Sequence, residues 1–132
     1  MAEGALMIIE RYMDAYNKAS FDDLRALVAN DYVHHSGASS LDIDGFCAGA
    51  SWIRQGLPDF YVTVDDQLVD GDRVAIRFTG SGRHTGSFGG EPPSGDTVTV
   101  FGTTIFRFAN GQIAEDWEAL DEQPFRDAMA KD

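Results

Sequence analysis

Three histidines and one carboxylate have residue types and positions that suit proton transfer. Asp121 follows an apolar strand pattern, shortly after Trp117. Burial at such a position disfavours the charged form of a carboxylate and raises its pKa toward working pH. Asp121 is therefore a candidate general base, and the alternative is that it begins a solvated C-terminal tail. The histidines are His34, His35 and His84.

The histidines differ in what they could do. His34 and His35 end a short extended segment, and because adjacent strand residues point to opposite faces, one of them could enter a pocket as a hydrogen-bond donor or proton shuttle. His84 precedes a glycine-rich loop, where it either lines a pocket entrance or fixes the loop through hydrogen bonds. The loop glycines lack a P-loop lysine, which argues against nucleotide binding. Adjacent histidines rarely converge on one ion and no HxH or HxxxH spacing is present, so we predict no metal site.

The elements that must position these side chains follow from hydrophobic periodicity. Apolar spacing predicts helices over residues 3–18, from Ser20 to near Asn30, and over about 41–55. The remainder is typical of strands, with hairpin turns predicted at 70–72 and 110–111. Helices followed by a strand meander predict an α+β fold, with the helices on one face of a curved antiparallel sheet.

Strand alternation predicts which way the last strand presents its side chains. Without a bulge, Asp121 lies on the same side as Ile113 and Trp117, the side that the helices cover. Glu115 would share that side, which is unfavourable for a charged residue. A bulge would remove the conflict.

The composition limits the class of partner. The chain has 132 residues, the size of one domain, and a formal net charge of −12 from 22 acidic and 10 basic residues. This charge repels phosphate backbones and anionic membranes, so we expect neither nucleic acid nor a membrane as partner. The single cysteine, Cys47, excludes an intrachain disulfide. No signal peptide or membrane-span pattern is evident, which favours a soluble cytoplasmic protein.

Several ordered segments are similar to a known family. They are DYVHH, WIRQGLPDF, DGDRVAIRFTGSGRHTGSFGGEPPSG and GTTIFRFANGQIAEDWEALD. Together they resemble the SnoaL-like polyketide cyclases, or ester cyclases, of the nuclear transport factor 2-like superfamily. The resemblance covers residues 1–132 as a single domain. It implies a cone-shaped curved antiparallel sheet with about three N-terminal helices enclosing a deep pocket.

The resemblance also implies a site and a reaction. In these cyclases an aspartate near the end of the last strand is the base of an intramolecular aldol condensation, which needs no metal or organic cofactor. Asp121 matches that position, and the resemblance favours His35 or His84 as the donor that stabilises the enolate. The expected ligand-binding side chains are His34, Tyr16, Trp52, Phe88, Thr104, Phe106 and Trp117. Phe106 stands where the cyclases carry a polar residue, which departs from the family pattern.

We therefore expect an enzyme of the cyclase or isomerase type that acts on a small hydrophobic carbonyl compound. One alternative is a small-molecule-binding or assembly module of the same fold without catalysis. Others are cofactor-free oxygenation and epoxide opening, for which an Asp–Arg–Asp constellation would be expected. Because an open sheet with an apolar outer face needs covering, we also expect a homodimer.

Overall fold

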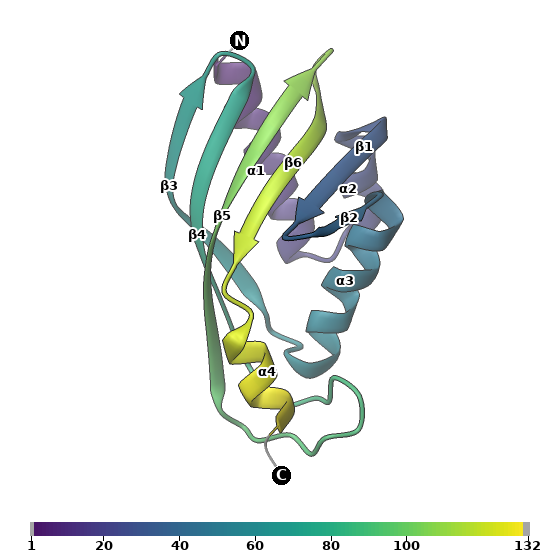
Figure 1. Ribbon diagram of the computed structural model, residues 1–132, viewed down its shortest axis with the longest axis vertical. Helices are drawn as coiled ribbons and strands as arrows, with labels where there is room; N and C mark the ends of the chain where they lie inside the picture. Colours follow the sequence, from purple (N-terminus) through teal and green to yellow (C-terminus); the bar gives the residue numbers. More distant parts are fainter. Residues whose placement is uncertain (1, 131–132) are drawn as a thin grey trace.

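A six-stranded curved sheet that does not close into a barrel carries helices on its concave side (Figure 1). The computed structural model describes residues 2–130 of the chain. Its helices are α1 (Ala2–Asn17), α2 (Phe21–Ala26), α3 (Ile43–Gly56) and α4 (Gln123–Ala130). Its strands are β1 (Val28–Ser36), β2 (Ser39–Leu41), β3 (Tyr61–Asp70), β4 (Arg73–Arg83), β5 (Thr97–Ala109) and β6 (Gln112–Leu120). The predicted α+β class is confirmed.

The strand order is β2-β1-β6-β5-β4-β3. All neighbouring strands are antiparallel except β1 and β6, which run parallel. Both predicted hairpin turns are present, and each places residues in the left-handed region that such turns require. Gly71 has φ 61°, and Asn110 and Gly111 have φ 54° and 75°. Strands β6 and β5 therefore form the middle of the sheet, flanked by β1 and β4, with β2 and β3 at its edges.

Two elements differ from the predictions. The second helix ends at Ala26 rather than near Asn30, because Val28 already belongs to β1 and pairs with Ile113 of β6. No helix was predicted after Asp121, but the C-terminal segment contains helix α4, whose Phe125 is buried. This helix packs along the lower part of β5, beside α3 (Figure 1).

A register shift between β5 and β6 changes which side chains face the helices. Arg107 pairs with Glu115, but the next residue of β5, Phe108, pairs with Ile113. The extra residue, Ala114, is a bulge, and it shifts the alternation of the rest of β6 by one. The alternation expected without a bulge therefore does not hold, and the bulge that would remove the conflict at Glu115 is present. Beyond Ala114 the even-numbered residues face the concave side, which brings Asp116 inward.

Side-chain contacts with backbone atoms hold α1 and α3 over the concave face. The Asn17 amide donates to Val62 O at 2.9 Å and accepts from Val62 N at 2.8 Å, which joins the end of α1 to β3. The Arg54 guanidinium of α3 donates to Tyr16 O at 2.6 Å and to Phe60 O at 2.9 Å. These bonds fix the distance between the helices and the sheet, and so the space between them.

Candidate active site

A cavity of about 240 Å³ lies between the concave face of the sheet and helices α1, α3 and α4. Most of its wall is apolar. Its polar lining side chains are Tyr12, Tyr16, His34, Ser36, Thr104, Asp116, Glu118 and Glu122. Among the described residues that line it, none is lysine or arginine.

The sheet register explains why these polar groups gather. His34 pairs with Asp116, and Asp116 pairs with Phe106, so the three side chains form one row across β1, β6 and β5. A second row, two residues away along each strand, joins Ser36, Glu118 and Thr104. Each of these six side chains lines the cavity. Three parts of the sequence that are far apart therefore meet on one patch of the concave face.

A buried hydrogen-bonded chain runs through Asp116. Its Oδ2 accepts a hydrogen bond from the Tyr32 hydroxyl at 2.5 Å, and its Oδ1 lies 2.5 Å from His34 Nδ1. Asp116 has no exposed surface, and Tyr32 and His34 are almost fully buried. With an ionised Asp116, Nδ1 of His34 carries the hydrogen and Nε2 is left as the basic atom. The edge of the Phe46 ring packs on the imidazole with ring centroids 4.8 Å apart, which holds its orientation.

The ionisation of these groups is set by burial and by Asp116. Burial by itself lowers the pKa of His34, but the hydrogen bond and negative charge of Asp116 outweigh it and raise the pKa above its usual 6.5. Burial, followed by the charge of Asp116, raises the pKa of Tyr32, so this hydroxyl stays protonated as a donor. Burial also raises the pKa of Glu118, although the nearby His34 partly offsets it. Glu118 Oε1 lies 3.7 Å from His34 Nε2.

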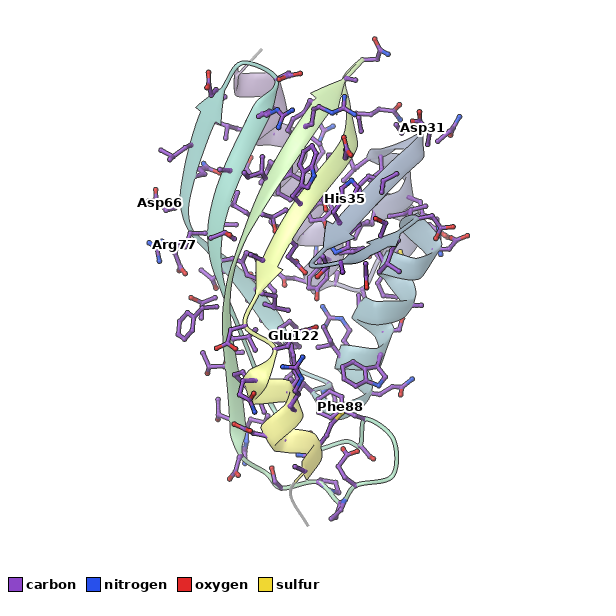
Figure 2. All side chains as sticks on the ribbon, in the orientation of Figure 1. Asp31, His35, Asp66, Arg77, Phe88 and Glu122 are labelled. Atoms are coloured by element: carbon purple, nitrogen blue, oxygen red, sulfur yellow. The ribbon has the colours of Figure 1, made fainter. Side chains whose placement is uncertain are left out.

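His35 and Trp117 lie on the outer face of the sheet, away from the cavity. His35 Nε2 lies 2.6 Å from Glu115 Oε2, and the imidazole stacks on Trp117 with centroids 5.5 Å apart. The Arg73 guanidinium lies over the Trp117 ring, 5.0 Å from its centroid. Figure 2 shows His35 on the sheet surface opposite the helices. The predicted role of His35 as a donor in the pocket is therefore wrong, and so is the placement of Trp117 there.

Asp121 is exposed and does not line the cavity. Strand β6 ends at Leu120, and Asp121 Oδ1 accepts a hydrogen bond from Gln123 N at 3.1 Å, at the start of α4. The carboxylate at the predicted position of the base therefore bonds to the backbone in the turn between β6 and α4. The inward carboxylates near it are Glu118 and Glu122. Glu122 lies above α4 (Figure 2).

His84 fixes the loop that follows β4 and has no exposed surface. Its Nε2 lies 2.8 Å from Glu91 Oε2 and its Nδ1 lies 3.0 Å from Ser94 Oγ. Phe88 of this loop is buried against Trp52, with centroids 4.7 Å apart. Neither His84 nor Phe88 lines the cavity, so His84 fixes the loop through hydrogen bonds, as one of its two predicted roles had it, and the placement of Phe88 at the pocket is wrong. Phe88 instead supports Trp52, a lining residue, from behind.

Five predicted residues do line the cavity: Tyr16, His34, Trp52, Thr104 and Phe106. Tyr32, Asp116 and Glu118 also belong to the site and were not predicted from the sequence. Asp116 and Glu118 alternate along the strand segment EDWEA, a signal that becomes readable only once the bulge is placed. Tyr32 has the same alternation with His34 on β1.

Two further properties concern metals and membranes. Within residues 2–130, no group of three or more His, Cys, Asp or Glu side chains is arranged to hold a metal ion. Over the same residues, every helix is too short or too polar to cross a bilayer.

Comparison with known proteins identifies one family and one fold. The family model described as SnoaL-like polyketide cyclase matches residues 6–128. AclR, a candidate hydroxylase from Streptomyces galilaeus, has a similar structure with a TM-score of 0.86 at 24% identity, covering 98% of this chain and 96% of that one.

Two further solved structures are similar. A candidate SnoaL-like polyketide cyclase from Jannaschia sp. CCS1 has a TM-score of 0.84 at 25% identity, covering 98% of this chain and 94% of that one. IdmH, a candidate polyketide cyclase from Streptomyces antibioticus, has a TM-score of 0.81 at 27% identity, covering 94% and 96%. Among curated proteins, no sequence matches this chain significantly.

Proposed function

Because the chain belongs to the SnoaL-like polyketide cyclase family, we propose that it catalyses proton transfer on a hydrophobic carbonyl compound, in an intramolecular cyclisation or an isomerisation. His34 is the acid–base residue and Asp116 is its positioning residue. The observation that carries this proposal is the buried chain from Tyr32 through Asp116 to His34, at the wall of an apolar cavity.

The chain of hydrogen bonds supports a base at Nε2 of His34. Asp116 holds the imidazole by Nδ1 and stabilises the imidazolium that forms when Nε2 takes a proton, while Tyr32 keeps the carboxylate in place. Removal of a proton next to a carbonyl group gives an enolate. In a cyclisation, the enolate carbon then attacks a second carbonyl group. In an isomerisation, the enolate is instead protonated at another carbon. Side-chain acid–base chemistry accounts for each of these steps.

The cavity wall indicates the kind of compound that fits. Its volume of about 240 Å³ lies below the roughly 300–1,000 Å³ of pockets for drug-sized ligands. A compound of one or two rings therefore matches it better than a larger ring system. Phe106, which packs edge-on against Tyr12 with centroids 5.2 Å apart, provides an apolar surface beside His34 rather than a polar helper.

Exchange of the α-protons of 2-tetralone for deuterium, followed by ¹H NMR in D₂O, tests this proposal. The protein should accelerate exchange, and His34→Asn should reduce the acceleration about 100-fold. His35→Asn is the matched control, because the neighbouring histidine lies on the outer face and its loss should leave the rate unchanged. Equal rates for His34→Asn and the unmodified protein would exclude His34 as the acid–base residue.

A module that binds small molecules without catalysis is the main competing function. It predicts saturable binding of 2-tetralone with no acceleration of exchange, so the same experiment separates the two. Epoxide opening by an Asp–Arg–Asp constellation has less support, because none of the described lining residues is an arginine. Oxygenation without a cofactor would be recognised by consumption of O₂ with a suitable substrate.

Homodimerisation through the outer face of the sheet is also part of the proposal. Leu68, Ala75, Ile105 and Trp117 are register partners in one row across four strands. Leu68 and Ile105 are 70% and 42% exposed, and the four helices leave this face uncovered (Figure 1). Burial of this row against a second copy would remove apolar surface from water. Sedimentation equilibrium should show a dimer that Ile105→Glu weakens, and a monomer at all concentrations would refute it.

A further inference from the structure

Glu118 is the second ionisable group beside the reactive nitrogen of His34. Its carboxyl lines the cavity with a side chain 20% exposed, and Oε1 lies 3.7 Å from His34 Nε2. This separation is too long for a hydrogen bond between the two groups. It leaves both free to contact a third group placed between them. Thr104 and Ser36 flank Glu118 on the neighbouring strands, so the carboxyl is held within the polar patch of the wall.

The surroundings of Glu118 keep it in its neutral form over a wider pH range than an exposed glutamate. Burial raises its pKa, the charges of Asp116 and Glu122 raise it further, and His34 acts in the opposite direction. The ionisable groups that interact with it are Asp116 on its own strand, Tyr32 and His34 on β1, Tyr12 and Tyr16 on α1, and Glu122 before α4. A neutral carboxyl group is a hydrogen-bond donor, whereas a carboxylate only accepts.

We propose that Glu118 is a second proton-transfer residue of this cavity, whose carboxyl O–H donates to the carbonyl oxygen of an uncharged ketone or aldehyde while His34 Nε2 removes the α-proton. This inference rests on the proposed function of His34. The two groups approach the substrate from positions 3.7 Å apart on the cavity wall, which matches one carbonyl group and its neighbouring carbon.

The proton balance closes within the cavity. The α-C–H bond breaks, its electron pair forms the C=C bond of an enol, and the carbonyl oxygen takes the proton of Glu118. His34 is then an imidazolium and Glu118 a carboxylate. When the imidazolium protonates another carbon, the enol O–H proton returns to Glu118, and both residues regain their starting forms. The substrate has then been isomerised without any net transfer of protons to solvent.

The charges of the wall select against anionic compounds. Besides Glu118, the acidic side chains among the described lining residues are Asp116 and Glu122, and no lysine or arginine lies among them. A carboxylate or phosphate in the cavity would face these acids without a fixed cation to pair with. The substrate class is therefore an uncharged carbonyl compound rather than a keto acid or an acyl phosphate.

Binding of 2-tetralone and of 2-naphthoate, an anion of similar size, tests the inference independently of catalysis. Quenching of Trp52, which lines the cavity, reports on occupancy. We expect the ketone to bind at least about tenfold more tightly than the anion, and its affinity to fall about tenfold as pH rises through the ionisation of Glu118. In Glu118→Gln the amide still donates but does not titrate, so this pH dependence should disappear. Glu115→Gln is the control, because Glu115 lies on the outer face of the same strand, and this variant should retain the pH dependence of ketone binding.

Exchange of 2-tetralone α-protons then tests proton transfer by Glu118. Glu118→Gln should slow exchange about 100-fold and remove the high-pH limb of the rate profile, and Glu118→Asp should restore part of the rate. An unchanged rate and pH profile in Glu118→Gln would overturn the proposal, as would equal binding of the anion. If His34→Asn leaves exchange unaffected, the proposed function fails, while the pH dependence of ketone binding still decides whether Glu118 donates to the carbonyl.

Discussion

The hydroxyl of Tyr32 makes a prediction about stability that depends directly on the buried chain. Tyr32→Phe removes the hydrogen bond to Asp116 Oδ2 at 2.5 Å and changes little else, because the ring keeps its shape. A hydrogen bond to a charged group contributes about 1.5–3 kcal/mol to stability. The free energy of unfolding should fall by about that amount, since Asp116 has no exposed surface through which water could replace the hydroxyl.

Urea denaturation followed by circular dichroism measures this change. For a chain of this size the same loss lowers Tm by about 5–15 °C. Tyr61→Phe is the matched control, because Tyr61 is 60% exposed on β3 and should change stability by less than about 0.5 kcal/mol. If both variants have the same stability, Asp116 is not held by Tyr32 and the buried chain does not exist as described.

Three further predictions concern the core, the pH dependence of stability and the loop after β4. Gly56→Ala should destabilise the protein by about 1–3 kcal/mol in the same denaturation experiment, because an added Cβ would lie 2.5 Å from the Phe88 ring; unchanged stability would contradict this packing. The pKa values of Glu118 and His34 are raised on folding, so the folded state binds more protons than the unfolded state. The free energy of unfolding should therefore decrease as pH rises, starting at about pH 4.5 for Glu118 and at about pH 6.5 for His34. Denaturation across this range should give a shallower slope for Glu118→Gln, and an identical slope would refute the shift. Desolvation acts to raise the pKa of Glu91, but hydrogen bonds from backbone amides of its loop and from His84 outweigh it and lower the pKa to about 2. Glu91→Ala should therefore speed hydrogen exchange at Phe88 N, and unchanged protection would show that other contacts hold the loop.

The order of elements could be predicted from the sequence because it depends on local signals. Helical periodicity indicated α1 and α3, and the Asn110-Gly111 pair indicated the hairpin that joins β5 and β6. The predicted end of the second helix was wrong because Val28 pairs with Ile113 of the distant strand β6 instead of continuing the helix. The local apolar pattern around Val28 does not reveal this long-range strand pairing.

The site was harder to predict because one bulge determines it. Ala114 shifts the alternation of β6, so Asp116 and Glu118 turn inward while Trp117 turns outward. The conflict created by Glu115 indicated that a bulge was needed, but nothing in the residue types fixed its position. The register irregularity of β1 lies before the two histidines, so strand alternation correctly places His34 and His35 on opposite faces. Alternation alone does not say which of the two faces the helices.

Helix α4 is a second reason why the base was misplaced. Strand β6 ends at Leu120 and α4 starts at Gln123, so Asp121 lies in the turn between them and bonds to Gln123 N, while Phe125 of α4 lines the cavity. The helix has only eight residues, so its apolar spacing gives a weak local signal. An aspartate that matches a family position in the sequence can therefore differ from the one that the fold buries.

Titration of the His34 imidazole by ¹⁵N NMR tests the central claim most directly. The account predicts a pKa above 6.5, a neutral form protonated at Nδ1, and a fall in the pKa in Asp116→Asn, because burial then acts on the imidazole without the charge of its partner. Addition of 2-tetralone should perturb the Nε2 signal and leave His35 unchanged. A pKa at or below 6.5, with the neutral form protonated at Nε2 and no response to Asp116→Asn, would contradict the pairing on which the proposed chemistry depends.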